Sequence, residues 1–108
     1  MANILLLGLD SLLASDLIPV LRNLGHNVTV AAGHETASEV SKTDLIFAGS
    51  EELRQALAMS PKRPVIVTSR LPDMNSWITA LEAGAADYCG APFEPTQVRW
   101  LLNTALAA

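Results

Sequence analysis

The chain has 108 residues, of which 50% are hydrophobic and 17% charged, and its formal net charge is −4. This composition excludes an intrinsically disordered protein, which needs low hydrophobicity and high charge, and no apolar run approaches the ~18 residues of a membrane span. The negative charge and the scattered basic residues argue against binding to nucleic acid, because that requires a basic face.

The first half of the chain alternates apolar runs with helical spacing. Residues 3–7 are a compact apolar run that predicts a buried strand, and they lack the basic leader of a secretory signal. A helix that stops at Gly25 follows, with Ser11 or Ser15 as its N-cap. We favour the longer helix from Ser11, kinked at Pro19 because proline removes one of its hydrogen bonds.

The middle of the chain holds the strand around which the sheet is built. Residues 27–31 predict a second strand, and residues 34–40 predict a short helix. Residues 44–48 contain an unbroken apolar run, which places this strand at the centre of a parallel sheet covered from both sides. In such sheets chemistry occurs at the carboxyl ends of the strands. Here the tip carries Gly49 and Ser50, with no acid, thiol or imidazole.

Three helices and two strands are expected in the remainder of the chain. Ser50 caps a helix that begins with two acids and ends before Pro61. Strands follow at 65–68 and 87–90. The helix between them has an apolar stripe that we expect to face inward. The last helix has Pro95 in its first turn, and we expect it to bury a longer stripe. The two stripes are Met74, Ile78 and Leu81, and then Val98, Leu101, Leu102, Ala105 and Leu106.

Five strand–helix units of about 20 residues predict a parallel sheet with helices on both faces, joined by right-handed crossovers. We expect one domain over residues 1–108, because a chain of this length buries roughly two-thirds of its unfolded surface. The single Cys89 has no partner for an internal disulfide, and its neighbours are small or apolar. A buried, unreactive thiol in a reducing cytoplasm is therefore expected.

Residues 82–93 resemble part of a known family. They read Glu-Ala-Gly-Ala-Ala-Asp-Tyr-Cys-Gly-Ala-Pro-Phe and are similar to the end of a response-regulator receiver domain, which reads roughly EAGADDYLxKPF there. The resemblance extends more generally over the other strands and the last helix. It implies the flavodoxin-like, doubly wound α/β fold: a five-stranded parallel sheet of order 2-1-3-4-5 with helices on both faces. It also implies a cis peptide bond before Pro92.

The resemblance assigns each position of the receiver's phosphorylation site. The acceptor aspartate is matched by Gly49 and the lysine of the receiver pattern by Ala91. The two acids that hold Mg²⁺ are matched by Gly8 and Leu9, so that only the following Asp10 is acidic. Phosphoryl transfer needs a nucleophile, a divalent cation and positive charge near the transferred group. We therefore expect no phosphoacceptor, no catalytic residue, no metal and no cofactor. We also expect that the protein is not an enzyme.

Two switch-like positions and an interaction face complete the comparison with receivers. The hydroxyl residue after the fourth strand is Ser69, and the aromatic switch position is Tyr88. Trp100 is predicted to point outward from the last helix, and Trp77 lies at the margin of the preceding stripe. Receivers commonly associate through the fourth helix, fifth strand and fifth helix. The expected interaction face, for a protein partner or a homodimer, consists of Trp77, Tyr88, Trp100 and Asn103.

The predicted function is that of a degenerate receiver, a pseudo-receiver. It acts by protein–protein interaction in a two-component-type phosphorelay system without being phosphorylated. One alternative is a small-ligand-binding domain that uses the crevice at Gly8, Gly49 and Ser69, because small residues leave room there. Another is the N-terminal regulatory module of a larger protein. Neither nucleic acid nor a membrane is expected as a partner.

Overall fold

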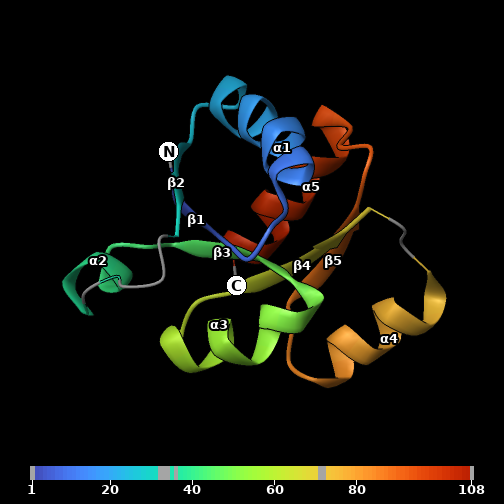
Figure 1. Cartoon of the computed structure of the whole chain (residues 1–108). Coiled ribbons are helices and arrows are strands. Elements are labelled where there is room, and N and C mark those ends of the chain that lie inside the picture. Colours follow the sequence, from blue (N-terminus) through green and yellow to red (C-terminus); the bar gives the residue numbers. More distant parts are fainter. Residues whose placement is uncertain (1, 32–34, 36, 71–72, 108) are drawn as a thin grey trace.

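The computed structural model describes residues 2–31, 35, 37–70 and 73–107. Its centre is a five-stranded sheet of order β2-β1-β3-β4-β5, in which neighbouring strands run parallel (Figure 1). The strand order and the flavodoxin-like fold implied by the resemblance are therefore confirmed. The strands are β1 (Asn3–Leu7), β2 (Asn27–Val30), β3 (Leu45–Gly49), β4 (Val65–Ser69) and β5 (Asp87–Gly90).

Helices cover both faces of the sheet: α1 and α5 lie on one face, and α3 and α4 on the other (Figure 1). The longer form of the first helix, with Pro19 inside it, is confirmed. Of the helix predicted at 34–40, residues 34 and 36 lie outside the described residues. The helical segments are α1 (Ser11–Asn23), α2 (Ala37–Ser41), the 3₁₀ turn η1 (Ser50–Glu52), α3 (Leu53–Met59), α4 (Met74–Glu82) and α5 (Pro95–Leu106).

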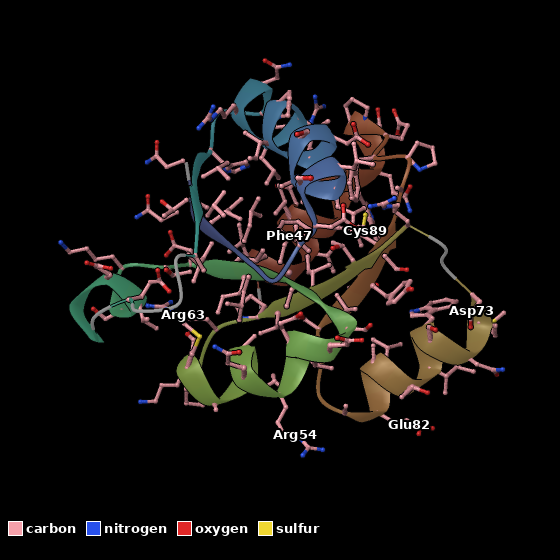
Figure 2. The ribbon with its side chains drawn as sticks, in the orientation of Figure 1. Phe47, Arg54, Arg63, Asp73, Glu82 and Cys89 are labelled. Carbon is pink, nitrogen blue, oxygen red and sulfur yellow. The ribbon has the colours of Figure 1, made fainter. Side chains whose placement is uncertain are left out.

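The central strand β3 is buried on both faces, as its apolar run predicts. Residues 45–48 are each 0% exposed. Because side chains alternate along a strand, Leu45 and Phe47 pack into the core beneath α1 and α5 (Figure 2), while Ile46 and Ala48 pack into the core beneath α3 and α4. Burial of each large side chain contributes roughly 1.5–3 kcal/mol, so β3 holds the two layers together.

Acidic side chains cap the N-termini of α1, α4 and α5. In α1 the Asp10 carboxylate accepts a hydrogen bond from the Leu13 backbone N–H at 2.9 Å, so the predicted caps Ser11 and Ser15 are wrong. Ser50 is not a cap either, because η1 begins without a side-chain capping bond. The equivalent bonds run from Ser76 to Asp73 in α4 and from Gln97 to Glu94 in α5, both at 2.8 Å.

The C-terminal third of the chain agrees with most of the predictions made for it. Cys89 is buried and unpaired among the described residues, and burial raises the pKa of its thiol to about 11. The Ala91–Pro92 bond is cis, as the resemblance implies. Leu106 is 37% exposed, so its predicted burial is wrong; α5 ends at this residue.

Within the described residues, the helices are too short or too polar to cross a bilayer.

Candidate functional site

The residues that match the receiver's phosphorylation site meet at one edge of the sheet. Gly8 follows β1, Gly49 ends β3, Ser69 ends β4 and Ala91 follows β5. The register of β1 with β3, and of β3 with β4, keeps the strand ends level. Parallel strands place their carboxyl ends at the same edge, where ligand sites of this fold lie. We call this edge the vestigial site.

Glu52, in η1, fills the space that the two glycines leave. A Cβ atom built on Gly8, whose φ is +72°, would overlap with Cγ and Cδ of Glu52, and one built on Gly49 would lie 3.1 Å from Glu52 Oε2. The carboxylate therefore lies across both glycines. Its Oε2 atom is buried and has no hydrogen-bond partner among the described residues. The crevice predicted to have room for a small ligand is thus covered by the protein's own side chain.

Asp10 is paired with Arg70 across the mouth of the vestigial site. Arg70 follows β4, and its Nη2 lies 2.8 Å from Asp10 Oδ2, while its Nε donates a hydrogen bond to the same oxygen at 3.1 Å. The hydrogen bond from the Leu13 N–H, and then the Arg70 guanidinium, hold the pKa of Asp10 below its ordinary value. Both side chains are about half exposed, so the pair contributes little to stability.

These contacts do not fit Mg²⁺ or phosphoryl transfer. Gly49 has no side-chain nucleophile, and Ala91 supplies no cation. Mg²⁺ prefers several carboxylate and water oxygens in a near-octahedral shell, whereas Asp10 faces a guanidinium and Glu52 lies against two glycines. Across the part of the chain that the structure describes, no cluster of three or more potential metal ligands is found.

Glu52 and Arg70 were not identified as residues of this site from the sequence. Glu52 comes shortly after Gly49, and Arg70 directly follows β4. A polar residue just beyond a strand at the carboxyl edge of a parallel sheet is the signal that points to both. The other two matched positions, Leu9 and Ala91, are partly buried and pack against the core beneath α1 and α5.

The second predicted region, around α4, presents large apolar side chains to solvent. Of the α4 residues, Ala80 is buried, so the predicted inward stripe is wrong. Residues three and four apart share one side of a helix, which groups four exposed side chains into a single row, the α4 row. The α4 row consists of Met74 (63% exposed), Trp77 (42%), Ile78 (45%) and Leu81 (39%).

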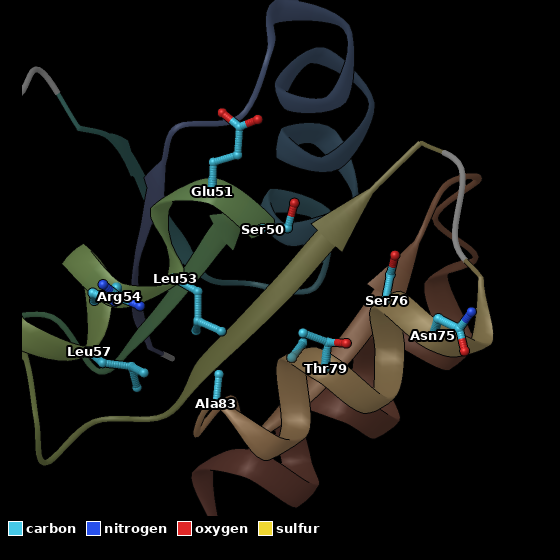
Figure 3. Close-up of a pocket in the computed structure, with 10 residues that line it drawn as sticks. Ser50, Glu51, Leu53, Arg54, Leu57, Asn75, Ser76, Thr79 and Ala83 are labelled. Carbon is cyan, nitrogen blue, oxygen red and sulfur yellow. The ribbon is translucent and has the colours of Figure 1, made fainter.

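The side of α4 that faces the protein carries small residues. Ala80 packs into the core beneath α3 and α4. Thr79 and Ala83 face Leu53 of α3 across a groove of about 720 Å³ (Figure 3). Small residues let α4 approach the sheet without burying its large ones. Figure 2 shows Asp73 and Glu82 at the two ends of this helix, at the outside of the molecule.

The predicted interaction face forms a groove of about 870 Å³ between α4 and α5, over β5, which we call the α4–α5 groove. Trp77, Tyr88 and Trp100 line it, and Trp100 is 62% exposed. The Tyr88 hydroxyl is buried and has no hydrogen-bond partner in the described part of the chain. Asn103 is exposed on α5 but is not part of the lining. Three of the four predicted residues therefore come together.

The α4–α5 groove is also acidic. Asp73, Asp87 and Glu94 line it, and no Lys, Arg or His occurs among the described residues of its lining. The hydrogen bond from the Ser76 N–H holds the pKa of Asp73 below its ordinary value, and the bond from the Gln97 N–H does the same for Glu94. Asp73 and Glu94 are therefore negatively charged at neutral pH.

Among curated proteins, the sequence is similar to a transcriptional regulatory protein of Salmonella. No protein-family model matches the chain. The transcriptional regulatory protein ZraR of Salmonella typhimurium is 28% identical over 99 residues, and that of Salmonella typhi has the same identity. The alignment covers 82% of this chain and 22% of the relative, so the chain spans about a fifth of the length of the curated relatives it matches.

Solved structures share the fold at low identity. A response-regulator receiver domain protein of Clostridium thermocellum has a TM-score of 0.78 at 20% identity, covering 99% of this chain and 95% of that one. A putative pilus assembly-related protein of Burkholderia pseudomallei has a TM-score of 0.80 at 18% identity, with coverage of 99% and 90%. A putative pilus assembly protein of Burkholderia thailandensis has 0.77 at 20%, with 100% of both chains covered. The chain thus has the fold of response-regulator receiver domains.

Proposed function

We propose that residues 1–108 form one receiver-like signalling domain that acts by binding protein partners without being phosphorylated. The observation that carries this proposal is the α4 row, which leaves four large apolar side chains in water beside the α4–α5 groove. Contiguous exposed apolar surface of this kind marks interaction sites on proteins. The partner is another protein of a regulatory system or a second copy of this chain.

The vestigial site supports the second part of the proposal. Phosphoryl transfer to a receiver needs an acceptor carboxylate with room for a phosphoryl group, and here Glu52 covers Gly49. Arg70 pairs with Asp10, the acid that follows the two matched metal-ligand positions in the sequence. Information therefore passes by contact between surfaces, as expected of a signalling module that is not an enzyme.

Incubation with acetyl phosphate and Mg²⁺, followed by measurement of the intact mass, tests the absence of phosphorylation. We expect no stable gain of one phosphoryl group, whereas a receiver with its acceptor aspartate gains one under the same conditions. The single change Gly49→Asp is also expected to gain none, because Glu52 lies over that position. A stable gain on the unchanged chain would contradict the proposal.

Trp100→Glu tests the interaction face. Because Trp100 is 62% exposed, the change should leave the fold intact and weaken association by about tenfold or more. Leu12→Glu is the matched control, since Leu12 is 60% exposed but lies on α1, away from the groove. Light scattering measures self-association, and recovery of proteins from an extract of the native host measures other partners. Equal binding by both variants would contradict this role of the face.

A narrower proposal concerns pilus assembly. The putative pilus assembly protein and the putative pilus assembly-related protein of Burkholderia match this chain over nearly its whole length, with TM-scores of 0.77 and 0.80. We propose that the chain acts as an interaction module of such a system. Deleting its gene from the native host should reduce the number of pili seen by electron microscopy, and a plasmid copy should restore it. Unchanged piliation would remove this narrower proposal and leave the broader one standing.

Two predictions from the sequence remain predictions. One is a cytoplasmic location, which the buried and unpaired Cys89 supports because a reducing compartment keeps thiols free. The other is that the chain is the N-terminal regulatory module of a larger protein. The full reading frame in the native genome tests the second, and fractionation of native cells tests the first.

A further inference from the structure

The α4–α5 groove combines aromatic rings with acidic groups, and this combination specifies the chemistry of its partner. The rings come from α4, β5 and α5, so they line the groove from both walls and its floor. The acids stand at the N-terminal ends of the same three elements. The rings belong to Trp77, Tyr88 and Trp100, and the acids are Asp73, Asp87 and Glu94.

The electrostatic balance of the groove is negative. Its described lining contains three acids and no base. Arg99 lies on α5 outside the lining, and its charge lowers the pKa of Glu94 less than the backbone hydrogen bonds do. Arg70, the basic residue that follows β4, is engaged by Asp10 on the vestigial site. Of these two bases, only Arg99 is therefore left to balance the charge of the three groove acids.

Resting on the function proposed above, we infer that the α4–α5 groove binds a segment of a partner protein in which Lys or Arg lies beside apolar side chains. The apolar side chains pack on the α4 row, and the cations lie between the groove acids and the faces of Trp77 and Trp100. Tryptophan faces attract cations, and arginine stacks on them well. Desolvated aromatic side chains at the centre of a contact are the usual anchors of binding.

A second copy of this chain fits the groove less well. A two-fold contact places the same patch of both copies together, so the acids of one groove face the acids of the other. Like charges brought together in this way suppress association. The net charge of −4 on each copy adds to the repulsion. A different protein with a basic segment satisfies the groove acids instead.

The protein itself supplies the reporter for a test. The chain has two tryptophans, and both line the groove, so their fluorescence reports its occupancy. The probe is a set of peptides selected from a random displayed library on the immobilised protein. We expect the selected peptides to contain more Lys and Arg than Asp and Glu, next to apolar residues. Their binding should shift tryptophan emission and weaken by about fivefold or more as salt is raised, because salt screens exposed charges.

Two triple variants separate the groove from net charge. Asp73→Asn, Asp87→Asn and Glu94→Gln neutralise the groove. Each keeps a side-chain oxygen that can accept the hydrogen bond from the Ser76, Tyr88 or Gln97 N–H, so the fold should persist. The control removes the same charge from exposed positions outside the lining of this groove. It consists of Asp16→Asn, Glu51→Gln and Glu82→Gln. We expect the first variant to bind the selected peptides at least about tenfold more weakly than the control.

The outcomes distinguish this inference from the proposed function. Equal weakening in both triple variants, or selection of acidic or uncharged peptides, overturns the inference; loss of binding in Trp100→Glu then still supports the proposed function. If the wild type forms a dimer that Trp100→Glu dissociates and that the triple groove variant strengthens, the occupant of the groove is a second copy of this chain. That result also overturns this inference and leaves the proposed function standing. If the groove variant and Trp100→Glu both bind like the wild type, the proposed function fails as well.

Discussion

Two helices on opposite faces of the sheet, α1 and α4, orient their apolar sides in opposite ways. On one face, α1 and α5 bury most of their apolar stripes against the sheet, as the spacing predicts, and only the terminal Leu106 of the α5 stripe is exposed. On the other face, α4 buries Ala80 and turns the α4 row to solvent. Helical spacing is equally regular in both cases. A period of 3.6 residues shows that a helix has an apolar side, but it does not show what covers that side.

Replacing one leucine on each face should produce the largest contrast. Leu17 of α1 is 0% exposed, whereas Leu81 of α4 is 39% exposed. Leu17→Ala leaves a cavity and should lower the free energy of unfolding by about 2–5 kcal/mol. Leu81→Ala should change it by no more than about 0.5 kcal/mol, as for other surface substitutions. Urea denaturation followed by circular dichroism measures both, and similar losses would show that α4 is packed like α1.

The same contrast explains which parts of the fold could be predicted from the sequence. The run at 45–48 is apolar at every position, and only a central parallel strand buries both of its sides, so β3 was predictable. The presence of α4 was predictable too, but the sequence did not predict which side of this helix faces the sheet. Its protein-facing side is made of small residues, the buried Ala80 and the partly buried Ser76, which carry little hydrophobic signal.

The contents of the vestigial site were only partly predictable. That Gly49 offers no side-chain acceptor can be read directly from the sequence, because it depends on a single position. The ion pair between Asp10 and Arg70 joins residues 60 positions apart, so it depends on the meeting of β1 and β4 ends across the sheet edge. The position of Glu52 depends in the same way on the short turn η1, which the expected helix starting at Ser50 does not contain.

A second test concerns how η1, the turn that precedes α3, is attached to the edge of the sheet. Gly8 has a φ of +72°, and Glu52 lies on it. Gly8→Ala should therefore cost at least about 1 kcal/mol in backbone strain and at least about 1 kcal/mol in overpacking. Glu52→Ala should restore the packing part and leave the strain. A double-mutant cycle in urea measures this coupling, and additive effects would show that the two residues do not touch.

The capping acids give a smaller contrast, because Asp10 caps a buried helix and Asp73 an exposed one. Asp10→Ala should lower the Tm of the whole domain by a few degrees. Asp73→Ala should mainly speed amide hydrogen exchange within α4, since few buried side chains hold that helix and it opens locally. Asp10→Asn and Asp73→Asn keep the acceptor oxygen and serve as controls. Equal drops in Tm would place α4 in the same cooperative unit as α1.

The smallest effect is expected at acid pH, where the two caps can be compared without changing their shape. Hydrogen bonds from the Leu13 and Ser76 N–H groups hold the pKa of Asp10 and Asp73 below the ordinary value. Such a carboxylate gives its full stabilisation above its unfolded pKa of about 3.9, and the stabilisation is lost as pH falls through the lower folded pKa.

On acidification below about pH 4, the Tm of the wild type should therefore fall, and Asp10→Asn should fall less steeply, because an amide does not titrate. Asp73→Asn should leave the slope of Tm almost unchanged and reduce only the acid-induced increase in hydrogen exchange of α4. Asp10→Asn also removes the ion pair with Arg70, so the difference between the two slopes combines that pair with how tightly each helix is held on the sheet. Identical slopes in Tm would mean that the outward row of α4 does not weaken its attachment to the sheet.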